Sequence, residues 1–304
     1  MMISREIKKS VLIPIVFFSW FKFPLSLKEL RRYLWQAELS EADIAAYLKE
    51  LPHVRCEGGW VWRGELWGGR ATQVNLSAQL WRKVHRWRWL FSQVPFISEV
   101  CVSNTLAYDN ATSNSDIDLL IVAQTGRIWI ARAYLILLLN LFKLRVRSTA
   151  KFGKFSPEFF VSEKALNIQS LALTKDYYLS YWLADLVPIW PDGEHHKFRQ
   201  SNNWVAGQLP IAWRSPKLRK CRYSKPSFFR WLIEKILAGK LGDKLETEAY
   251  YRQKKIIDKN ILRLGINPSV ITTRDIIKLH FNDRRAEVSE NIEQALNDLA
   301  SKTK

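Results

Sequence analysis

Cysteine is scarce in this sequence, which has three such residues in 304, at positions 56, 101 and 221. They are too few and too far apart for a disulfide framework or a cysteine-based zinc site. Unpaired thiols are typical of a reducing compartment, so we expect a cytoplasmic protein. Internal repeats and low-complexity tracts are also lacking.

Long uninterrupted apolar runs are lacking as well. Residues 11–21 follow three basic residues, as in a signal peptide, but no small-residue cleavage site comes after them. Residues 128–142 contain an arginine and an asparagine and are shorter than the roughly 20 residues that a spanning helix needs. We therefore expect no membrane span, and we expect residues 128–142 to form a buried helix.

Acidic residues are few beside basic ones, 29 against 47, which gives a net charge of +18 and a pI near 9.9. Such an excess predicts a polyanionic partner, whether nucleic acid, nucleotide or membrane surface, although a merely soluble surface is the alternative. Apolar residues make up 47% of the chain and aromatic residues 13%, which is enough for a sizeable core and excludes wholesale disorder. The excess gathers on residues 80–90 and on the C-terminal part.

The first 70 residues have the pattern of three short helices and a hairpin. The first helix covers residues 11–21 and is expected to be interrupted near Pro14. Ser26 with Glu29, and Ser40 with Asp43, are capping boxes that begin the next two helices. Gly58-Gly59 then predicts a tight turn between two short strands. This order is typical of a winged helix.

The third of these helices is poorly suited to binding duplex DNA. It carries Glu41, Asp43 and Glu50 against a single lysine, Lys49, and carboxylates repel phosphate. We therefore favour packing or protein interaction for the module at residues 1–70, with DNA readout as the alternative. A basic helix with interleaved tryptophans follows at 71–94 and either connects the two parts or stacks on single-stranded bases.

Residues 95–190 are expected to form a small mixed sheet with a packed helix. Strands are predicted at 97–103, 117–122 and 155–162, with the long helix at 127–143 between the last two. Pro188, Pro191 and Gly193 indicate a boundary, and residues 191–304 read as mostly helical. The fold class is therefore α/β (α+β), with about two domains.

Asp116 and Asp118 stand two residues apart at the start of the apolar strand Ile117 to Val122. Strand periodicity places both carboxylates on one face, with Cα atoms roughly 6.5 Å apart. Two neighbouring carboxylates repel each other unless a cation lies between them. Oxygen ligands of this kind suit Mg²⁺ or Mn²⁺ bound together with substrate phosphates. The alternative is that Asp116 merely begins a strand in a polar loop.

About eleven residues earlier, a strand runs into Asn104-Thr105, where backbone N–H groups and the threonine hydroxyl can bind phosphate. A strand followed by this turn and then by Asp-x-Asp on the next strand resembles the DNA polymerase β-like nucleotidyltransferase superfamily. Asn104-Thr105 stands where that superfamily has Gly-Ser. Asparagine is the residue that best replaces glycine at positive φ.

The resemblance implies a third acid on a later strand, which would help to bind metal and take the proton from the attacking hydroxyl. Glu158 is the candidate, Glu163 is the other nearby acid, and Glu158 as a surface residue is the alternative. The flanking sequence is similar to bacterial nucleotidyltransferase-domain proteins with a winged-helix-like N-terminus and no assigned substrate.

Basic residues outside the motif are open to two interpretations. Arg127 and Arg132 either reach a triphosphate or are structural surface charges. The late cluster of His280 with Asp283, Arg284 and Arg285 either closes over a substrate or ends a helix. His195-His196 lacks partners at metal-binding spacing and indicates a polar loop.

The resemblance implies a metal-dependent enzyme that transfers a nucleoside monophosphate from an NTP, by expectation ATP, to a hydroxyl and releases pyrophosphate. Asp116, Asp118 and Glu158 would hold the metal, and Asn104, Thr105 and Arg127 the phosphates. The acceptor could be RNA, DNA or a protein hydroxyl. The alternative is a non-catalytic nucleotide- or nucleic-acid-binding regulatory protein with a degenerate site.

Overall fold

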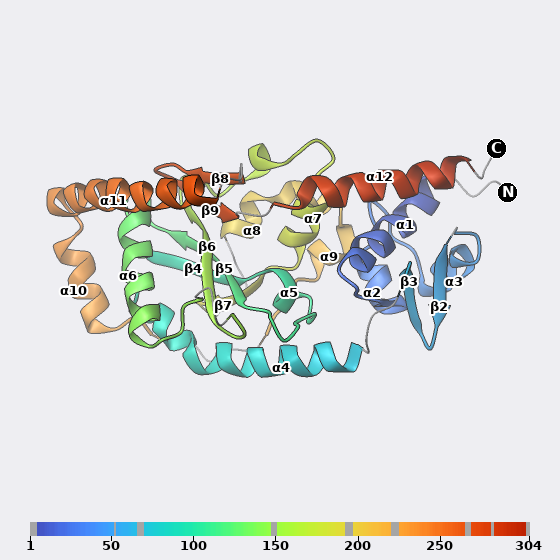
Figure 1. Ribbon diagram of the computed structural model, residues 1–304, viewed down its shortest axis with the longest axis horizontal. Helices are drawn as coiled ribbons and strands as arrows, with labels where there is room; N and C mark the ends of the chain where they lie inside the picture. The colour runs from blue at the N-terminus through green and yellow to red at the C-terminus, as the bar shows by residue number, and fades with distance from the viewer. Residues whose placement is uncertain are drawn as a thin grey trace.

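The computed structural model describes residues 5–51, 53–65, 70–146, 151–191, 197–219, 225–264, 269–280 and 283–301. It is a mixed α+β structure with a six-stranded mixed sheet in the order β7-β4-β5-β6-β9-β8 (Figure 1). These strands are β4 (Ile97–Val102), β5 (Ile117–Ala123), β6 (Phe155–Ser162), β7 (Val187–Trp190), β8 (Ser269–Thr272) and β9 (Ile276–His280). A smaller sheet pairs β1 (Leu25–Ser26), β3 (Trp60–Arg63) and β2 (Val54–Glu57) in that order.

Helices pack against both sheets (Figure 1). The α-helices are α1 (Arg5–Trp20), α2 (Leu27–Arg32), α3 (Glu41–Leu48), α4 (Arg70–Trp87), α5 (Asn104–Ala107), α6 (Ile128–Leu141), α7 (Tyr177–Ala184), α8 (Lys197–Ser201), α9 (Pro210–Arg214), α10 (Phe228–Ile236), α11 (Lys240–Leu264) and α12 (Arg285–Ser301). Three 3₁₀ turns are η1 (Arg88–Gln93), η2 (Gln169–Leu171) and η3 (Asn203–Gly207). The predicted basic helix at 71–94 is therefore α4 followed by η1.

β5, which contains the unbroken apolar run, lies in the interior of the large sheet. β5 pairs antiparallel with β4 and parallel with β6, and α6 makes the crossover between β5 and β6. Leu119 and Ile121 belong to the core cluster that contains Trp129 of α6, while Leu120 and Val122 belong to the opposite cluster. Both faces of β5 are thus covered, as its unbroken apolar sequence predicts.

The sequence did not predict three strands of this sheet, β7, β8 and β9. β7 contains Pro188, one of the residues that indicate a boundary in the sequence, and it is an edge strand, where a missing N–H is tolerated. β8 and β9 lie within the region expected to be mostly helical, and β9 pairs with β6. The sheet is therefore not confined to residues 95–190, because the C-terminal region completes one edge of it.

The N-terminal elements follow their predicted order, with a short strand, β1, added. Both capping boxes are present: the Ser26 hydroxyl accepts from the Glu29 N–H, and Ser40 does the same with Asp43. Gly58 and Gly59 form the two-residue turn between β2 and β3, with φ of +57° and +82°. Glycine occupies such left-handed conformations without the steric cost that a side chain brings.

Pro14 does not interrupt α1, contrary to the expectation from the sequence, because the helix is continuous from Arg5 to Trp20. A proline inside a helix leaves the carbonyl four residues earlier without its usual partner. That carbonyl belongs to Ser10, and it accepts a hydrogen bond of 3.2 Å from the N–H of Trp35. The group that Pro14 frees thus binds the segment after α2 to α1.

One hydrophobic core joins the N-terminal elements to the large sheet. Phe17 and Phe18 of α1 are fully buried in the same cluster as Leu120 of β5 and Phe159 of β6. The ring of Phe17 stacks on that of Tyr181 in α7, with centroids 4.2 Å apart. No helix in the described ranges is long and apolar enough to cross a membrane.

Because this core is continuous, we expect the first 70 residues and the large sheet to unfold together. Phe17→Ala should lower the free energy of unfolding by about 3–5 kcal/mol, the cost of truncating a buried phenylalanine. Urea titrations followed by far-UV circular dichroism and by tryptophan fluorescence should give coincident transitions. Ser40→Ala, which removes an exposed cap, is the control and should cost about 1 kcal/mol. Two separate transitions would contradict this prediction.

Candidate functional site

Asn104 lies where β4 passes into the short helix α5. Its φ is +56°, in the left-handed region that glycine usually occupies and asparagine tolerates best among other residues. The N–H of Ser103 donates to the Asp118 carbonyl at 3.0 Å, which continues the β4–β5 ladder to this point. The two halves of the sequence motif therefore meet at one end of an antiparallel pair.

Asp118 and Asn104 are in direct contact. The Asn104 side-chain amide donates to Oδ2 of Asp118 at 2.9 Å, and Tyr178 of α7 donates its hydroxyl to Oδ1 of Asn104 at 3.2 Å. Asp116 precedes β5 by one residue, and Ile117 between the two acids is fully buried. Thr105 lines a small hollow beside Asn104 and Tyr178.

Glu158 completes a group of three interacting carboxylates. Ser156 pairs in register with Asp118 across the parallel β5–β6 ladder, and its hydroxyl donates to Oε1 of Glu158 at 2.9 Å. A bulge at this point shifts the register between Leu119 and Leu120, so Glu158 is the extra residue of β6. Ser156 also lowers the pKa of Asp116, so its hydroxyl lies near both acids.

The three carboxylates hinder one another's ionisation. Burial and the negative charges of Asp116 and Glu158 raise the pKa of Asp118 well above its usual range, although the Asn104 amide opposes this. Burial also raises the pKa of Asp116 and of Glu158, against the hydrogen bonds of Ser156 and the charge of Lys151. Partly buried acids that repel each other are the setting in which a cation is bound.

The geometry of a closed metal site is not present in the part of the chain that the structure describes. No three His, Cys, Asp or Glu side chains there are grouped closely enough to hold an ion. Asp116, Asp118 and Glu158 have the oxygen donors that Mg²⁺ prefers, and one oxygen of Asp118 is taken by the Asn104 amide. These residues fit the donor chemistry of such an ion.

Arg127 and Glu163 lie away from this group. Both follow the carboxyl ends of their strands, whereas Asp116 and Asp118 stand at the start of β5, about 20 Å away along seven residues of strand. Arg127 donates to the carbonyls of Leu237 and Ala238 and pairs with Asp243. Its guanidinium therefore stabilises the turn between α10 and α11, and these contacts favour a structural role over phosphate binding.

Arg132, in contrast, lies near Glu158 at the bulge of β6. It shares a cavity of about 430 Å³ with Glu158 and donates to Gln253 of α11. Burial lowers the pKa of Arg132 to about 10, and Glu158 opposes the shift. His195 and His196 lie outside the described residues.

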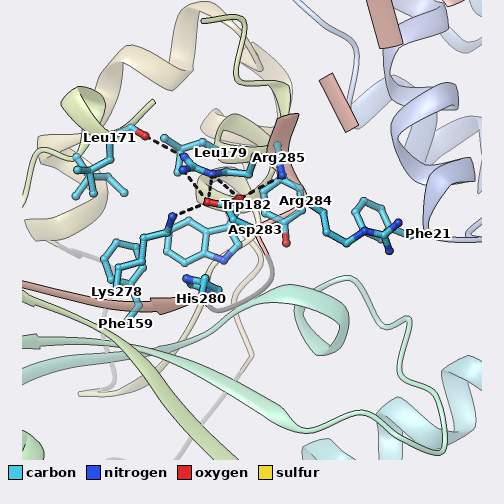
Figure 2. Close-up of a pocket in the computed structure, with 12 residues that line it drawn as sticks. Phe21, Phe159, Leu171, Leu179, Trp182, Lys278, His280, Asp283, Arg284 and Arg285 are labelled. Carbon is cyan, nitrogen blue, oxygen red and sulfur yellow. Dashed lines mark hydrogen bonds and ion pairs between the residues drawn. The ribbon is translucent and has the colours of Figure 1, made fainter. Parts of the chain in front are cut away.

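A second cavity, of about 130 Å³, has Tyr178 among its lining residues. Figure 2 shows other residues of its walls, among them Trp182 and His280. Its walls are mainly apolar and aromatic, with Phe159 of β6 and Trp182 of α7 packed ring to ring at 5.5 Å. A dry cavity of about 150 Å³ is known to hold one aromatic ring, so this one has the size of a single ring system.

The charged side chains around this cavity neutralise one another (Figure 2). Asp283 pairs with Lys278 at 2.7 Å and with Arg285 at 2.9 Å, and Arg285 also pairs with the buried Asp176. Arg284 pairs with Glu287. The cations of this cluster are thus already satisfied, and the cavity suits a neutral ring better than a phosphate.

His280 also lines this cavity, and one of its ring nitrogens, the buried Nδ1, lacks a hydrogen-bond partner among the described residues. Burial and the charge of Lys278 lower its pKa to about 4, so the imidazole is neutral near pH 7. A neutral imidazole can accept a hydrogen bond from a ligand N–H.

Sequence reasoning missed two residues of the site. Ser156 is two residues before Glu158 on the same strand, so strand periodicity could have indicated it. Tyr178 comes from α7, and nothing in its sequence context predicts the contact with Asn104. The chain matches no known protein family, no curated protein and no solved structure, so the site is interpreted from its own geometry.

Repulsion within the acidic group predicts that removing one charge stabilises the fold. In metal-free buffer at pH 7.5, Asp118→Asn should raise the free energy of unfolding by on the order of 1 kcal/mol, because the amide keeps the shape and loses the repelled charge. Urea denaturation measures the difference.

Asp283→Asn is the matched control for this substitution. Although burial acts against it, hydrogen bonds from Arg285 and Lys278 hold the pKa of Asp283 well below its usual range. The control should therefore lose about 1–3 kcal/mol. A loss of stability in Asp118→Asn would mean that Asp118 serves the fold rather than a site.

The lowered pKa of His280 predicts an acid-sensitive contribution to stability. The unfolded chain takes up a proton below about pH 6.5, whereas the folded chain does so only near pH 4. Stability is therefore unaffected above pH 6.5 and is lost as the pH falls toward 4. Between pH 7 and 4.5, wild type should lose about 2 kcal/mol more than His280→Gln. An equal loss in both proteins would contradict this prediction.

Proposed function

We propose that this protein is a metal-dependent nucleotidyltransferase that transfers a nucleoside monophosphate from an NTP to a hydroxyl acceptor. The observation that carries the proposal is the meeting of three neighbouring strands: Asn104 follows β4, Asp116 and Asp118 stand at the start of β5, and Glu158 lies at the bulge of β6. This is the strand–turn–strand order of the resemblance to the DNA polymerase β-like superfamily, with the acid of the third strand interacting with the other two.

In this proposal Asp116 and Asp118, with Glu158 moving closer to them, would hold Mg²⁺, and the bound ion would supply positive charge to the reacting oxygens of an in-line displacement. The acceptor oxygen forms a bond to the α-phosphorus, and the bond from that phosphorus to the bridging oxygen breaks, which releases pyrophosphate. Glu158, whose pKa is raised by burial, takes the proton of the acceptor hydroxyl. Asn104 positions Asp118 through its amide.

The 130 Å³ cavity suits the base of the nucleotide. Tyr178 lines it and contacts Asn104, so the cavity adjoins the carboxylates. Its apolar and aromatic walls accept a planar ring such as that of adenine. These features support ATP as the donor substrate.

The N-terminal elements support a winged-helix-like module. A helix, a short strand, two helices and a hairpin follow one another, as in such modules. The core that they share with the large sheet favours a packing role over free DNA binding. The acidic α3 favours the same interpretation.

One observation favours a non-catalytic nucleotide-binding protein as the second candidate. Asn104, which replaces the expected glycine, places its amide on Asp118 and occupies an oxygen that a metal would use. In that case the site binds a nucleotide and does not turn it over.

Incubation with α-labelled NTPs and Mg²⁺ should separate the two candidates. We expect label transfer and pyrophosphate release from the wild type, and a loss of at least about a thousandfold in Asp116→Asn/Asp118→Asn with unchanged circular dichroism. Asp258→Asn, which breaks an exposed ion pair on α11, is the matched control and should keep full activity. Activity that persists in the double variant would refute the proposal, and nucleotide binding without turnover in the wild type would favour the second candidate.

A further inference from the structure

Helix α10 presents its apolar side to solvent. Phe228 and Phe229 are 68% and 73% exposed, and Trp231, Leu232 and Ile236 are exposed as well. At 100° per residue these five side chains lie within one arc of the helix. A helix that packs on a core normally turns such an arc inward, so α10 is the reverse of an ordinary surface helix.

The charged side of α10 faces the protein and fixes this orientation. Arg230 is buried and donates to the Ile97 carbonyl at 2.7 Å and to Glu234 at 2.8 Å. Glu234 accepts from the Phe96 N–H at 2.7 Å, and the Arg230 guanidinium lies 4.8 Å from the ring of Trp190. Rotating the apolar arc inward would break these hydrogen bonds and leave the Ile97 carbonyl and the Phe96 N–H against apolar side chains, which costs free energy.

The turn after α10 extends the apolar surface onto α11. A Cβ atom on Gly242 would lie 1.9 Å from the carbonyl oxygen of Leu237, so only glycine allows this close approach. Leu241 and Leu245, one turn apart at the start of α11, are exposed. Figure 1 shows α10 and the start of α11 together at the left end of the molecule.

Lysines surround this surface. Lys235 lies within the apolar arc of α10 with its ammonium 5.6 Å from the Trp231 ring, and Lys240 and Lys244 neighbour Leu241 and Leu245 on α11. All three are exposed, and no ion pair joins them to another described residue. The whole chain adds a net charge of +18.

We propose that α10 and the first two turns of α11, the α10–α11 surface, insert shallowly into a bilayer that contains anionic phospholipid. Exposed tryptophan, phenylalanine and leucine beside lysines are the composition of helices that lie in the membrane interface. Each basic residue adds attraction to anionic headgroups, and a lysine within the arc can extend its ammonium to them.

Other occupants fit this surface less well. Protein interfaces are depleted in lysine at their centres, whereas Lys235 lies inside the apolar arc. Single-stranded nucleic acid stacks on aromatic rings but gains little from Leu232, Ile236, Leu241 and Leu245. The combination of aliphatic, aromatic and lysine side chains is therefore best matched by an anionic membrane surface.

Flotation of the full-length protein with vesicles tests the proposal. We expect binding to phosphatidylcholine vesicles that contain phosphatidylglycerol and at least tenfold weaker binding to phosphatidylcholine alone at physiological salt. Phe228→Ser/Phe229→Ser should weaken binding to the anionic vesicles by at least tenfold, because two rings no longer leave water. Both residues are exposed, so circular dichroism should not change. Brominated lipid should quench wild-type tryptophan fluorescence more than that of Trp231→Phe.

Val74→Ser/Leu173→Ser removes exposed apolar residues on other elements, α4 and the segment before α7, and should bind vesicles as the wild type does. Absence of binding to anionic vesicles, or equal binding by the Phe228/Phe229 variant, would overturn the proposal. So would a wild-type dimer that the Phe228/Phe229 variant dissolves, or binding of single-stranded RNA that this variant loses, since each assigns the surface to another occupant.

Discussion

The burial of α1 is the constraint on which the rest of the structure depends. Residues Ser10 to Phe18 are buried without interruption, so this helix has no solvent face along its middle. Such a helix needs neighbours on every side, and the hairpin, α12 and the aromatic rings of α7 provide them. Pro14 contributes a hydrogen bond to this packing. It leaves the Ser10 carbonyl free to accept from the Trp35 N–H, which holds the segment after α2 against α1.

This packing also determines where a site can exist. The sheet face that bears Leu120 and Val122 packs in one cluster with α1 and α7, and along β5 Asp118 is the residue that is not fully buried. Tyr178 belongs to α7 and reaches Asn104 there, so the helix that closes the core also contributes to the edge of the site. An acidic group at a partly covered strand end has less water to screen it, which explains why the pKa values of its members rise together.

Local patterns were sufficient to predict the elements whose signals are local. The capping boxes at Ser26 and Ser40, the Gly58-Gly59 turn and β6 at 155–162 were confirmed, because each depends on residues a few positions apart. β7, β8 and β9 were not predicted, since a four- or five-residue strand is stabilised by its partner rather than by its own pattern. In the same way Asp116 and Asp118 could be found from their spacing, whereas Tyr178 could not. For Arg127 the sequence left phosphate binding and a structural charge open; its contacts with Leu237 and Asp243 favour the structural role, and they could not be predicted because those residues lie more than a hundred positions away.

The excess positive charge has different roles in different parts of the fold. Around the 130 Å³ cavity the cations are consumed in ion pairs with Asp283, Asp176 and Glu287, so they contribute to structure and leave the cavity neutral. At the α10–α11 surface the lysines have no such partners among the described residues and stand beside exposed rings. Because an unpaired cation keeps its long-range attraction while a paired one largely loses it, the net charge acts outward mainly where lysines are unpaired. The excess of positive charge therefore favours an anionic partner at this surface more than at the candidate catalytic site. There the carboxylates need a metal ion rather than further basic residues.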